Sequence, residues 1–308
     1  MKKVIVTGPN GFVGNALLKS LSDQGIETIA IVKDGNENID KIKNLNGVRI
    51  EFCQLDNIKD LPKLVRDTDI DCCIHLGWAG SFGDSRADYK LQLKNAEYSS
   101  DLIITLSEMG IKRFVGAGTL AEKDVLNYHL TDGATPNAVS IYGIAKLTTQ
   151  LITKSLCSKL GIDHVWCYLC NTYGVGNSTN NFVNMVIRKF LKGERASFTP
   201  ATQIYDFTYI TDTANAILAA ADKGLKNRSY YLGSGDPKPL KEFITEIRDC
   251  FDPKYPLYFG EIPFNGISLK KEDYSTQKLF TDTGFKAQIP FTDGIKKTIE
   301  WFKKENIL

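Results

Sequence analysis

The sequence predicts an α/β protein built on a doubly wound parallel sheet, with a smaller α/β lobe toward the C-terminal end. Two observations lead to this prediction. Short β-branched runs recur through residues 3–169 with helix-length segments between them, and such alternation is typical of a parallel sheet covered by helices. The first run also leads directly into a glycine-rich turn and an amphipathic segment. With 308 residues, 43% of them hydrophobic, the chain can fill a core of this size.

Composition and charge exclude several classes of partner. Lys and Arg number 38 against 36 Asp and Glu, a net charge of +2 without a basic block, so we expect neither nucleic acid nor a membrane as a partner. The apolar run at residues 4–6 is too short for a signal peptide or a membrane span, and we expect a cytoplasmic protein. The seven cysteines fit reduced thiols, and Cys167 and Cys170 lie in an apolar run that favours core packing over a metal site.

Residues 3–7 form the first predicted strand, and a glycine turn follows it. The turn reads G-x-x-G-x-x-G over residues 8–14, and an amphipathic run continues to Gly25. Glycines let the backbone bend tightly and approach a pyrophosphate, while a helix N-terminus offers unpaired N–H groups and a positive dipole end. The pattern therefore predicts a dinucleotide-binding turn. Its expected cofactor contacts are Gly8, Asn10, Gly11, Phe12, Val13 and Gly14.

Residues 28–32 form the second predicted strand, whose end bears on the choice of dinucleotide. An acidic residue there binds the adenosine ribose and favours NAD, whereas a basic residue accommodates the 2′-phosphate of NADP. Here Lys33 comes first and Asp34 second. The order favours NADP slightly without excluding NAD, and a solvated charge pair in a loop is an equally good interpretation.

The alternation continues through the first half of the chain. Further strands are predicted at residues 48–55, 72–76, 113–117 and 164–169, with helices at residues 89–109 and 142–160. The third strand ends at Asp56, and we interpret His75, in the fourth, as a packed histidine at a strand end. Loops at the carboxyl ends of such strands are where open α/β sheets place their ligands.

The pattern weakens in two places. Residues 120–139 show no clear period, and beyond residue 174 prolines and turns separate shorter segments. Helices are still predicted at residues 181–192, 211–221, 240–250 and 292–304. We therefore expect a dinucleotide-binding domain at residues 1–173 with parts of 201–232, a smaller substrate lobe at 174–200 and 233–291, and a C-terminal helix at 292–308.

Tyr142 and Lys146 form the candidate reactive pair. Their spacing of four residues places both side chains on one face of a helix, about one turn apart. A nearby ammonium group favours the phenolate and is expected to lower the pKa of the tyrosine. The pair suits proton exchange with an alcohol or ketone oxygen. Because the spacing is common by chance, its meaning depends on the surrounding motifs.

Together these motifs resemble the extended short-chain dehydrogenase/reductase family, the NAD(P)-dependent epimerases and dehydratases of nucleotide sugars. The resemblance spans nearly the whole chain and implies a Rossmann-like domain. It rests on the glycine turn, His75-Leu76-Gly77, Asn95, Gly118-Thr119, Tyr142-x-x-x-Lys146, Asn171-x-Tyr173-Gly174 and the run from Tyr205 to Asp212.

The resemblance implies a role for each matching residue. Thr119 would hydrogen-bond the reacting oxygen, Tyr142 would be the acid–base group, and Lys146 would hold the cofactor ribose and assist the tyrosine. The remaining implied residues fall into two groups, with Asp56, Leu76 and Gly77 at the cofactor and Trp78, Asn171 and Tyr205, besides Thr119 and Tyr142, at the substrate.

Three departures from the family pattern narrow the reaction. Leu120-Ala121 follows Thr119 where dehydratases usually carry Asp-Glu, so dehydration is disfavoured. Tyr168 and Tyr205 stand where many members have arginines, one of them pairing with the substrate diphosphate. The diphosphate would then be held otherwise, with Arg188, Lys189 and Lys192 as candidates, or the substrate carries less phosphate. A solvated basic helix face explains those three residues equally well.

The sequence therefore predicts an NAD(P)-dependent oxidoreductase of a nucleotide sugar, of the 4-epimerase or 4-ketoreductase type. Two alternatives remain open: a reductase of a non-sugar ketone or aldehyde, and a non-catalytic dinucleotide-binding scaffold. The resemblance also implies a homodimer formed through the helices at residues 89–109 and 142–160. No metal site is expected.

Overall fold

The computed structural model describes residues 1–33, 39–133, 136–264, 266 and 268–307. The chain divides into two compact units, which we call the sheet unit and the second unit. The sheet unit contains Met1–Leu169, Ala214–Leu232 and Gln277–Phe285. The second unit contains Cys170–Thr213, Gly233–Thr276 and Lys286–Leu308.

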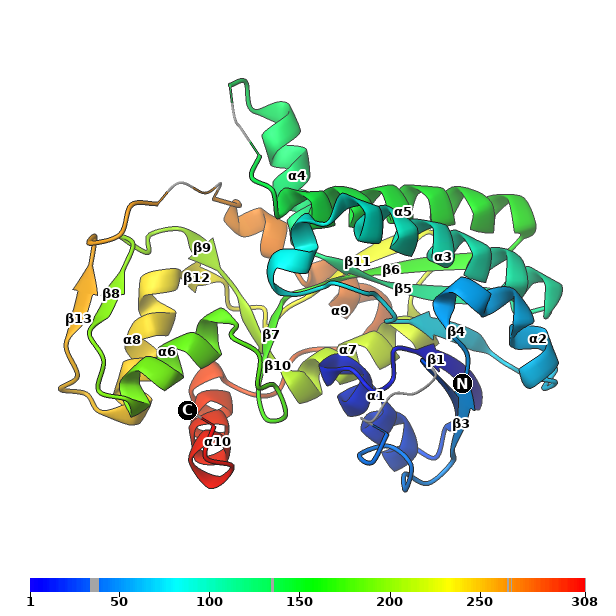
Figure 1. The fold of residues 1–308 in the computed structure, drawn as a ribbon, viewed down its shortest axis with the longest axis horizontal. Helices are drawn as coiled ribbons and strands as arrows, with labels where there is room; N and C mark the ends of the chain where they lie inside the picture. Colours follow the sequence, from blue (N-terminus) through cyan, green and yellow to red (C-terminus); the bar gives the residue numbers. More distant parts are fainter. Residues whose placement is uncertain (34–38, 134–135, 265, 267, 308) are drawn as a thin grey trace. The chain divides into compact units, whose positions relative to one another are not determined.

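A seven-stranded sheet forms the centre of the sheet unit (Figure 1). Its order is β11-β6-β5-β4-β1-β2-β3, and every neighbouring pair is parallel. The strands are β1 Lys3–Thr7, β2 Glu27–Val32, β3 Val48–Phe52, β4 Cys72–His75, β5 Arg113–Thr119, β6 Asp163–Leu169 and β11 Arg228–Leu232. The predicted doubly wound parallel sheet is confirmed. The strand order reverses between β1 and β4, the position where such sheets bind ligands.

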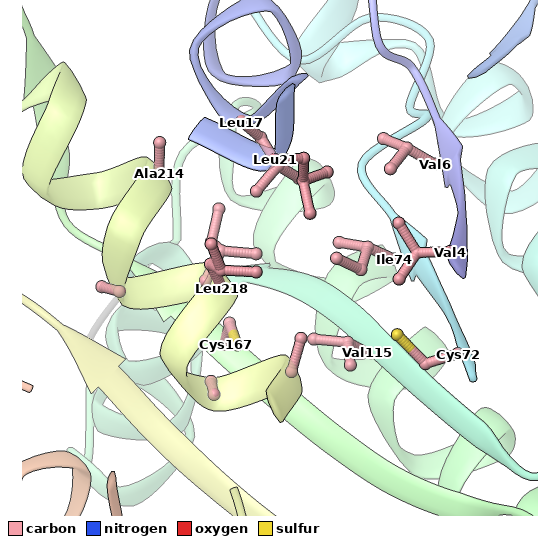
Figure 2. Packing of buried hydrophobic residues seen from close by; sticks show 14 of the residues in the cluster. Val4, Val6, Leu17, Leu21, Cys72, Ile74, Val115, Cys167, Ala214 and Leu218 are labelled. Atoms are coloured by element: carbon pink, nitrogen blue, oxygen red, sulfur yellow. The ribbon is translucent and has the colours of Figure 1, made fainter. Parts of the chain in front are cut away.

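Helices cover both faces of this sheet (Figure 1). One face packs under α1 Phe12–Asp23 and the second half of α7 Ile210–Lys223, and the other under α3 Tyr89–Glu108 and α5 Ser140–Leu160. Successive side chains of β1 point to opposite faces of the sheet and contribute to both cores. Val4 and Val6 belong to one buried cluster, and Ile5 belongs to the other. Figure 2 shows the first cluster, with α1 and α7 side chains facing those of β1 and β4.

Two shorter helices differ from the sequence prediction. Helix α4, Ala121–Leu130, lies in the stretch where no period was visible, since its one fully buried side chain is polar, that of Glu122. Helix α9, Gln277–Thr283, belongs to the sheet unit, although its residues fall within the range predicted for the smaller lobe. Leu279 of α9 is buried in the sheet core, and Tyr230 of β11 donates a hydrogen bond to Asp282 at 2.8 Å.

The described residues of the second unit form three two-stranded sheets and three longer helices. The strand pairs are β7 Asn171–Tyr173 with β10 Phe207–Tyr209, β8 Ala196–Phe198 with β13 Leu257–Phe259, and β9 Ile204–Tyr205 with β12 Lys238–Pro239. The helices are α6 Phe182–Leu191, α8 Leu240–Phe251 and α10 Phe291–Lys304. Aromatic rings fill its interior, with Phe243 and Phe291 at 4.7 Å between centroids. Throughout the described part of the chain, each helix is too short or too polar to span a membrane.

Candidate active site

The glycine turn between β1 and α1 forms a tight backbone cradle. Gly8 has φ +67°, and a Cβ atom there would lie 2.8 Å from the backbone nitrogen of Gly77. A Cβ atom on Gly14 would lie 2.2 Å from the carbonyl oxygen of Gly8. Gly11 caps α1 without a side-chain hydrogen bond, which leaves the first N–H groups of the helix available to an anion. These features fit the pyrophosphate of a dinucleotide.

A buried hydrogen-bond chain fixes the neighbouring strand end beside this turn. The Thr7 hydroxyl accepts from the backbone N–H of Gly77 at 3.1 Å and lies 2.7 Å from Nδ1 of His75. Nε2 of His75 lies 3.0 Å from the Ser99 hydroxyl. Burial, and then the charge of Lys146, lowers the pKa of His75 to about 3, so the ring is neutral near pH 7. His75 thus holds the Gly8–Gly77 approach in place.

Two of the residues expected at the adenosine end, Lys33 and Asp56, are exposed. Lys33 follows β2 and is exposed, and Asp34 lies outside the described residues. Asp56 is exposed on the 3₁₀ helix η1, Leu55–Asp60. Their roles at the cofactor stay predictions.

Thr119, Tyr142 and Lys146 meet at the carboxyl end of the sheet. Thr119 ends β5, and the other two lie one turn apart on α5, where both side chains are buried. The Thr119 side chain lies near enough to the Tyr142 phenol to act on its pKa, which it lowers. Lys146 donates from Nζ to the Ala117 carbonyl oxygen at 2.8 Å. The three residues predicted to be catalytic are thus brought together within one unit.

Trp78 connects this group to α3. Its ring centroid lies 3.8 Å from Nζ of Lys146, a cation–π contact, and it meets the Tyr142 ring edge-on at 6.1 Å. Its Nε1 donates to Oε1 of the buried Gln92 at 2.8 Å. Trp78, predicted to touch substrate, therefore lies directly against the candidate catalytic residues.

Burial dominates the acid–base properties of the pair. It raises the pKa of Tyr142 to about 12, against the opposing effects of Arg86 and the Thr119 side chain. Burial also lowers the pKa of Lys146, while the charge of Glu122 acts in the opposite direction. The predicted lowering of the Tyr142 pKa is therefore wrong for the protein by itself. Removing each side chain from water outweighs the effects of the neighbouring groups on its pKa.

Glu122 is a site residue that sequence reasoning missed. Its side chain is fully buried under Thr119, whose backbone N–H donates to Oε1 at 2.8 Å, and Trp166 donates from Nε1 to Oε2 at 3.1 Å. Burial raises the pKa of this carboxyl group. A Cβ atom on Gly118 would lie 2.2 Å from Nε1 of Trp166, which explains the glycine before Thr119. The only signal was an acidic residue three positions after Thr119.

Arg86 was also missed, because its loop carries no motif. It lies in the 3₁₀ helix η2, Gly83–Ala87, and its guanidinium carbon is 4.4 Å from the centroid of the Tyr142 ring. The positive charge of Arg86 therefore lies over the face of the Tyr142 ring.

The other predicted substrate residues belong to the second unit. Asn171 donates from Nδ2 to the carbonyl oxygen of Asp206 at 3.1 Å, and the Tyr205 ring stacks on Phe207 at 5.8 Å. Of the basic candidates, Arg188 donates to the Ser178 carbonyl oxygen at 2.7 Å, so its guanidinium already supports a loop. Lys189 lies 4.0 Å from Glu194, and Lys192 follows the end of α6. The roles of these residues in substrate binding stay predictions.

Comparison with family models gives one match over most of the chain. Residues 4–233 match the NAD dependent epimerase/dehydratase family. The chain belongs to this family. The resemblance inferred from the motifs is thereby confirmed. The description of the family names both epimerases and dehydratases.

Individual relatives of this chain are distant in sequence but cover most of its length. A putative UDP-glucose 4-epimerase of Methanocaldococcus jannaschii is 26% identical, over 98% of this chain and 99% of the relative. A dTDP-6-deoxy-L-talose 4-dehydrogenase (NAD(+)) of Aggregatibacter actinomycetemcomitans is 27% identical, over 83% and 94%. The crystal structure of UDP-glucose 4-epimerase from Thermotoga maritima with UDP-glucose superposes with a TM-score of 0.79 at 19% identity, covering 99% of both chains. The structural likeness establishes the shared fold.

Proposed function

We propose that the protein is an NAD(P)-dependent oxidoreductase of a nucleotide sugar, of the 4-epimerase or 4-ketoreductase type. The observation that carries the proposal is the meeting of Thr119, Tyr142 and Lys146 at the sheet edge that also bears the glycine cradle. The names of two relatives support both versions, since one is a putative 4-epimerase and the other a 4-dehydrogenase of a dTDP sugar.

The residues of the chain supply proton transfer and positioning. When bound, the nicotinamide cofactor supplies or accepts the hydride. Tyr142 gives a proton to the substrate oxygen or takes one from it, and the Thr119 hydroxyl beside Tyr142 orients that oxygen. Since burial keeps Tyr142 protonated at neutral pH, the protein by itself favours the proton-donating direction. Lys146, held against Ala117 and Trp78, is positioned to assist the tyrosine.

Dehydration is the less favoured chemistry for this site. Elimination of water needs an acid and a base besides the tyrosine, and the two positions after Thr119 carry Leu120 and Ala121. Glu122, one position later, is committed to Thr119 and Trp166 beneath the site. We therefore propose epimerisation or reduction rather than dehydration. A 6-deoxy-4-keto product from a nucleotide hexose would contradict this part of the proposal.

The cofactor form is proposed separately. The family is NAD dependent by its description, whereas exposed Lys33 after β2 would suit the 2′-phosphate of NADP. An epimerase retains NAD through its cycle, while a reductase exchanges NADPH. NAD that survives gel filtration would support the epimerase, and an empty protein that binds NADPH more tightly than NADH would support the reductase.

Replacing the tyrosine tests the enzyme proposal. Tyr142→Phe removes the exchangeable proton and should lower kcat by about 10²–10⁴-fold without loss of dinucleotide binding. Tyr89→Phe, at an exposed position on α3, is the matched control and should leave kcat unchanged. Full activity of Tyr142→Phe on the true substrate would sink the proposal. A protein that binds no dinucleotide would sink it as well.

A reductase of a non-sugar ketone is the second candidate function. One observation favours it. Tyr168 stands where many family members have an arginine, and its hydroxyl accepts a hydrogen bond from Nε2 of Gln150 at 2.8 Å rather than being free to bind a phosphate. Activity with simple ketones and none with nucleotide sugars would establish it. A non-catalytic scaffold is disfavoured because Thr119, Tyr142 and Lys146 are all present and assembled.

We also propose a homodimer formed through α3 and α5. Apolar side chains are exposed on both helices, including Leu93 at 54% and Leu151 at 57%. Burying such groups between two copies would release ordered water and stabilise the pair. Sedimentation that shows only monomer at micromolar concentration would refute this assembly.

A further inference from the structure

Arg86 presents unused hydrogen-bond donors beside the candidate catalytic tyrosine. Its Nε is buried without a partner, and among the described residues Arg86 makes neither a hydrogen bond nor an ion pair. Its guanidinium lies against the Tyr142 ring at 4.4 Å. A guanidinium has five N–H donors, and a buried donor without an acceptor, such as this Nε–H, is unfavourable. A charged side chain held in this way over the phenol points to a ligand that supplies the acceptors.

The segment that carries Arg86 is held in place by a side chain of α3. The fully buried Gln92 of α3 donates from Nε2 to the carbonyl oxygens of Gly80 at 2.8 Å and Ser85 at 2.9 Å. The Oε1 atom of the same residue accepts from Trp78. One buried amide therefore joins the Arg86 segment, the Trp78 ring and the helix. Arg86 is positioned as part of the site rather than as a loose surface side chain.

We propose that Arg86 binds a carboxylate of the sugar substrate, on the carbon next to the one whose oxygen exchanges a proton with Tyr142. This inference rests on the proposed function and narrows its substrate class to nucleotide sugars of the uronic acid type. The planar fork of a guanidinium matches the two oxygens of a carboxylate and binds them with two parallel hydrogen bonds. The same contact would give the unpaired donors of Arg86 their acceptors.

Distance favours a carboxylate over the diphosphate as the acceptor. In a reaction at the 4-position, the diphosphate is attached on the opposite side of the sugar ring, whereas the 5-carboxylate is on the adjacent carbon. Arg86 touches the ring of Tyr142 itself, so a group that it binds lies close to the oxygen that reacts. A positive charge at this position also favours the anionic substrate over its neutral counterpart.

A binding experiment with matched sugars tests the inference without depending on turnover. Calorimetric titration with NAD present compares UDP-glucuronic acid with UDP-glucose, and the dTDP forms of both sugars are measured in parallel. We expect the wild type to bind the carboxylate sugar at least about 10-fold more tightly. Arg86→Met should weaken UDP-glucuronic acid by about 10–100-fold and leave UDP-glucose within about threefold. Arg86→Lys keeps the positive charge but lacks the planar fork of the guanidinium. Its affinity for UDP-glucuronic acid should lie between those of the wild type and Arg86→Met.

Arg195 offers a matched control. Its guanidinium also stacks on an aromatic ring, that of Tyr258 at 3.5 Å, but it belongs to the second unit and pairs with Glu261. Arg195→Met should leave both affinities unchanged. If Arg86→Met fails to fold, the sugar preference of the wild type and of Arg86→Lys still decides the question.

The remaining outcomes overturn the inference in distinguishable ways. If Arg86→Met lowers the affinity for both sugars equally, Arg86 binds the diphosphate that they share. If the wild type binds UDP-glucuronic acid no more tightly than UDP-glucose, Arg86 does not bind a carboxylate. If NAD binds but no nucleotide sugar does, the sugar substrate of the proposed function fails together with this inference. If no dinucleotide binds, the proposed function fails at its first step.

Discussion

The glycine turn and the tyrosine pocket lie at the carboxyl ends of strands in one sheet, yet they are built by different means. The turn is a backbone structure, in which Gly8 and Gly14 are needed because a Cβ atom would overlap neighbouring main chain. The pocket, which we define as Thr119, Glu122, Tyr142 and Lys146, is assembled from buried polar and charged side chains. The turn is therefore sensitive to added volume, whereas the pocket is sensitive to the loss of partners and to pH.

The largest effect is expected from adding one methyl group to the turn. Gly14→Ala places a Cβ atom 2.2 Å from the Gly8 carbonyl oxygen and 2.8 Å from the backbone of Pro9, so the turn must open. We expect dinucleotide affinity to fall by at least about 100-fold, because the backbone no longer fits the pyrophosphate. Fluorescence titration with NAD and NADP measures it.

Gly11→Ala adds the same methyl group to the turn at a position where the protein itself has room for it. A Cβ atom at Gly11 meets only the Gly8 carbonyl oxygen at 3.5 Å, an ordinary contact, and Gly11 has an extended conformation with φ −73°. Gly11→Ala should therefore leave the free energy of unfolding unchanged, and any loss of dinucleotide affinity in this variant comes from crowding against the cofactor that Gly11 is predicted to contact. Wild-type affinity in Gly14→Ala would mean that the turn does not hold the cofactor by close backbone approach.

The same contrast explains what could be predicted from the sequence. A parallel sheet and its glycine turn depend on local patterns, β-branched runs and glycines at fixed spacing, and both are legible in the chain. Glu122 and Arg86 depend on partners 44 and 56 residues away, Trp166 and Tyr142, and no local pattern marks them. Helix α4 could not be predicted for the same reason, since its buried position holds a carboxylate rather than an apolar side chain.

The pKa of Tyr142 shows the limit of pairwise reasoning. Spacing on a helix correctly places Lys146 one turn from the tyrosine, and attraction between the two groups favours the phenolate. Spacing does not reveal how deeply the pair is buried, and burial acts in the opposite direction on both groups. The chemistry of the pocket therefore depends on its depth in the fold as much as on its residues.

Removing the buried carboxylate tests whether partners hold the pocket together. Glu122→Ala leaves the Thr119 N–H and the Trp166 Nε1–H without their acceptor, and each unsatisfied donor costs about 1–3 kcal/mol. We expect the free energy of unfolding to fall by roughly 3 kcal/mol in urea denaturation. Glu122→Gln keeps one acceptor oxygen and should cost about half as much.

Activity separates a positioning role of Glu122 from a purely structural one. The charge of Glu122 raises the pKa of Lys146, so Glu122→Gln should lower that pKa and move the pH profile of kcat/KM with it. Glu97→Ala, which removes an exposed glutamate paired with Lys94 at 2.8 Å, should change neither stability nor profile. An unchanged pH profile in Glu122→Gln would restrict the residue to packing.

The smallest effect is expected from acid acting on the aromatic stack beside the pocket. His164 lies between Phe114 and Trp166, with ring centroids at 5.7 Å to each, and burial lowers its pKa to about 4. Because the folded pKa lies below the unfolded value of 6.5, the neutral ring contributes stability above pH 6.5 that is lost as the pH falls toward 4.

His164→Phe keeps the stacked ring and removes the titrating group. Between pH 6.5 and pH 5 the wild type should lose on the order of 1 kcal/mol more stability than this variant, as measured by urea denaturation at each pH. The same substitution at exposed His129 should leave the pH dependence unchanged. Dinucleotide affinity should vary less over this range, because the glycine turn contributes backbone and no titrating side chain. Parallel pH slopes in wild type and His164→Phe would mean that the acid sensitivity of the sheet originates elsewhere, with His75 as the next group to replace.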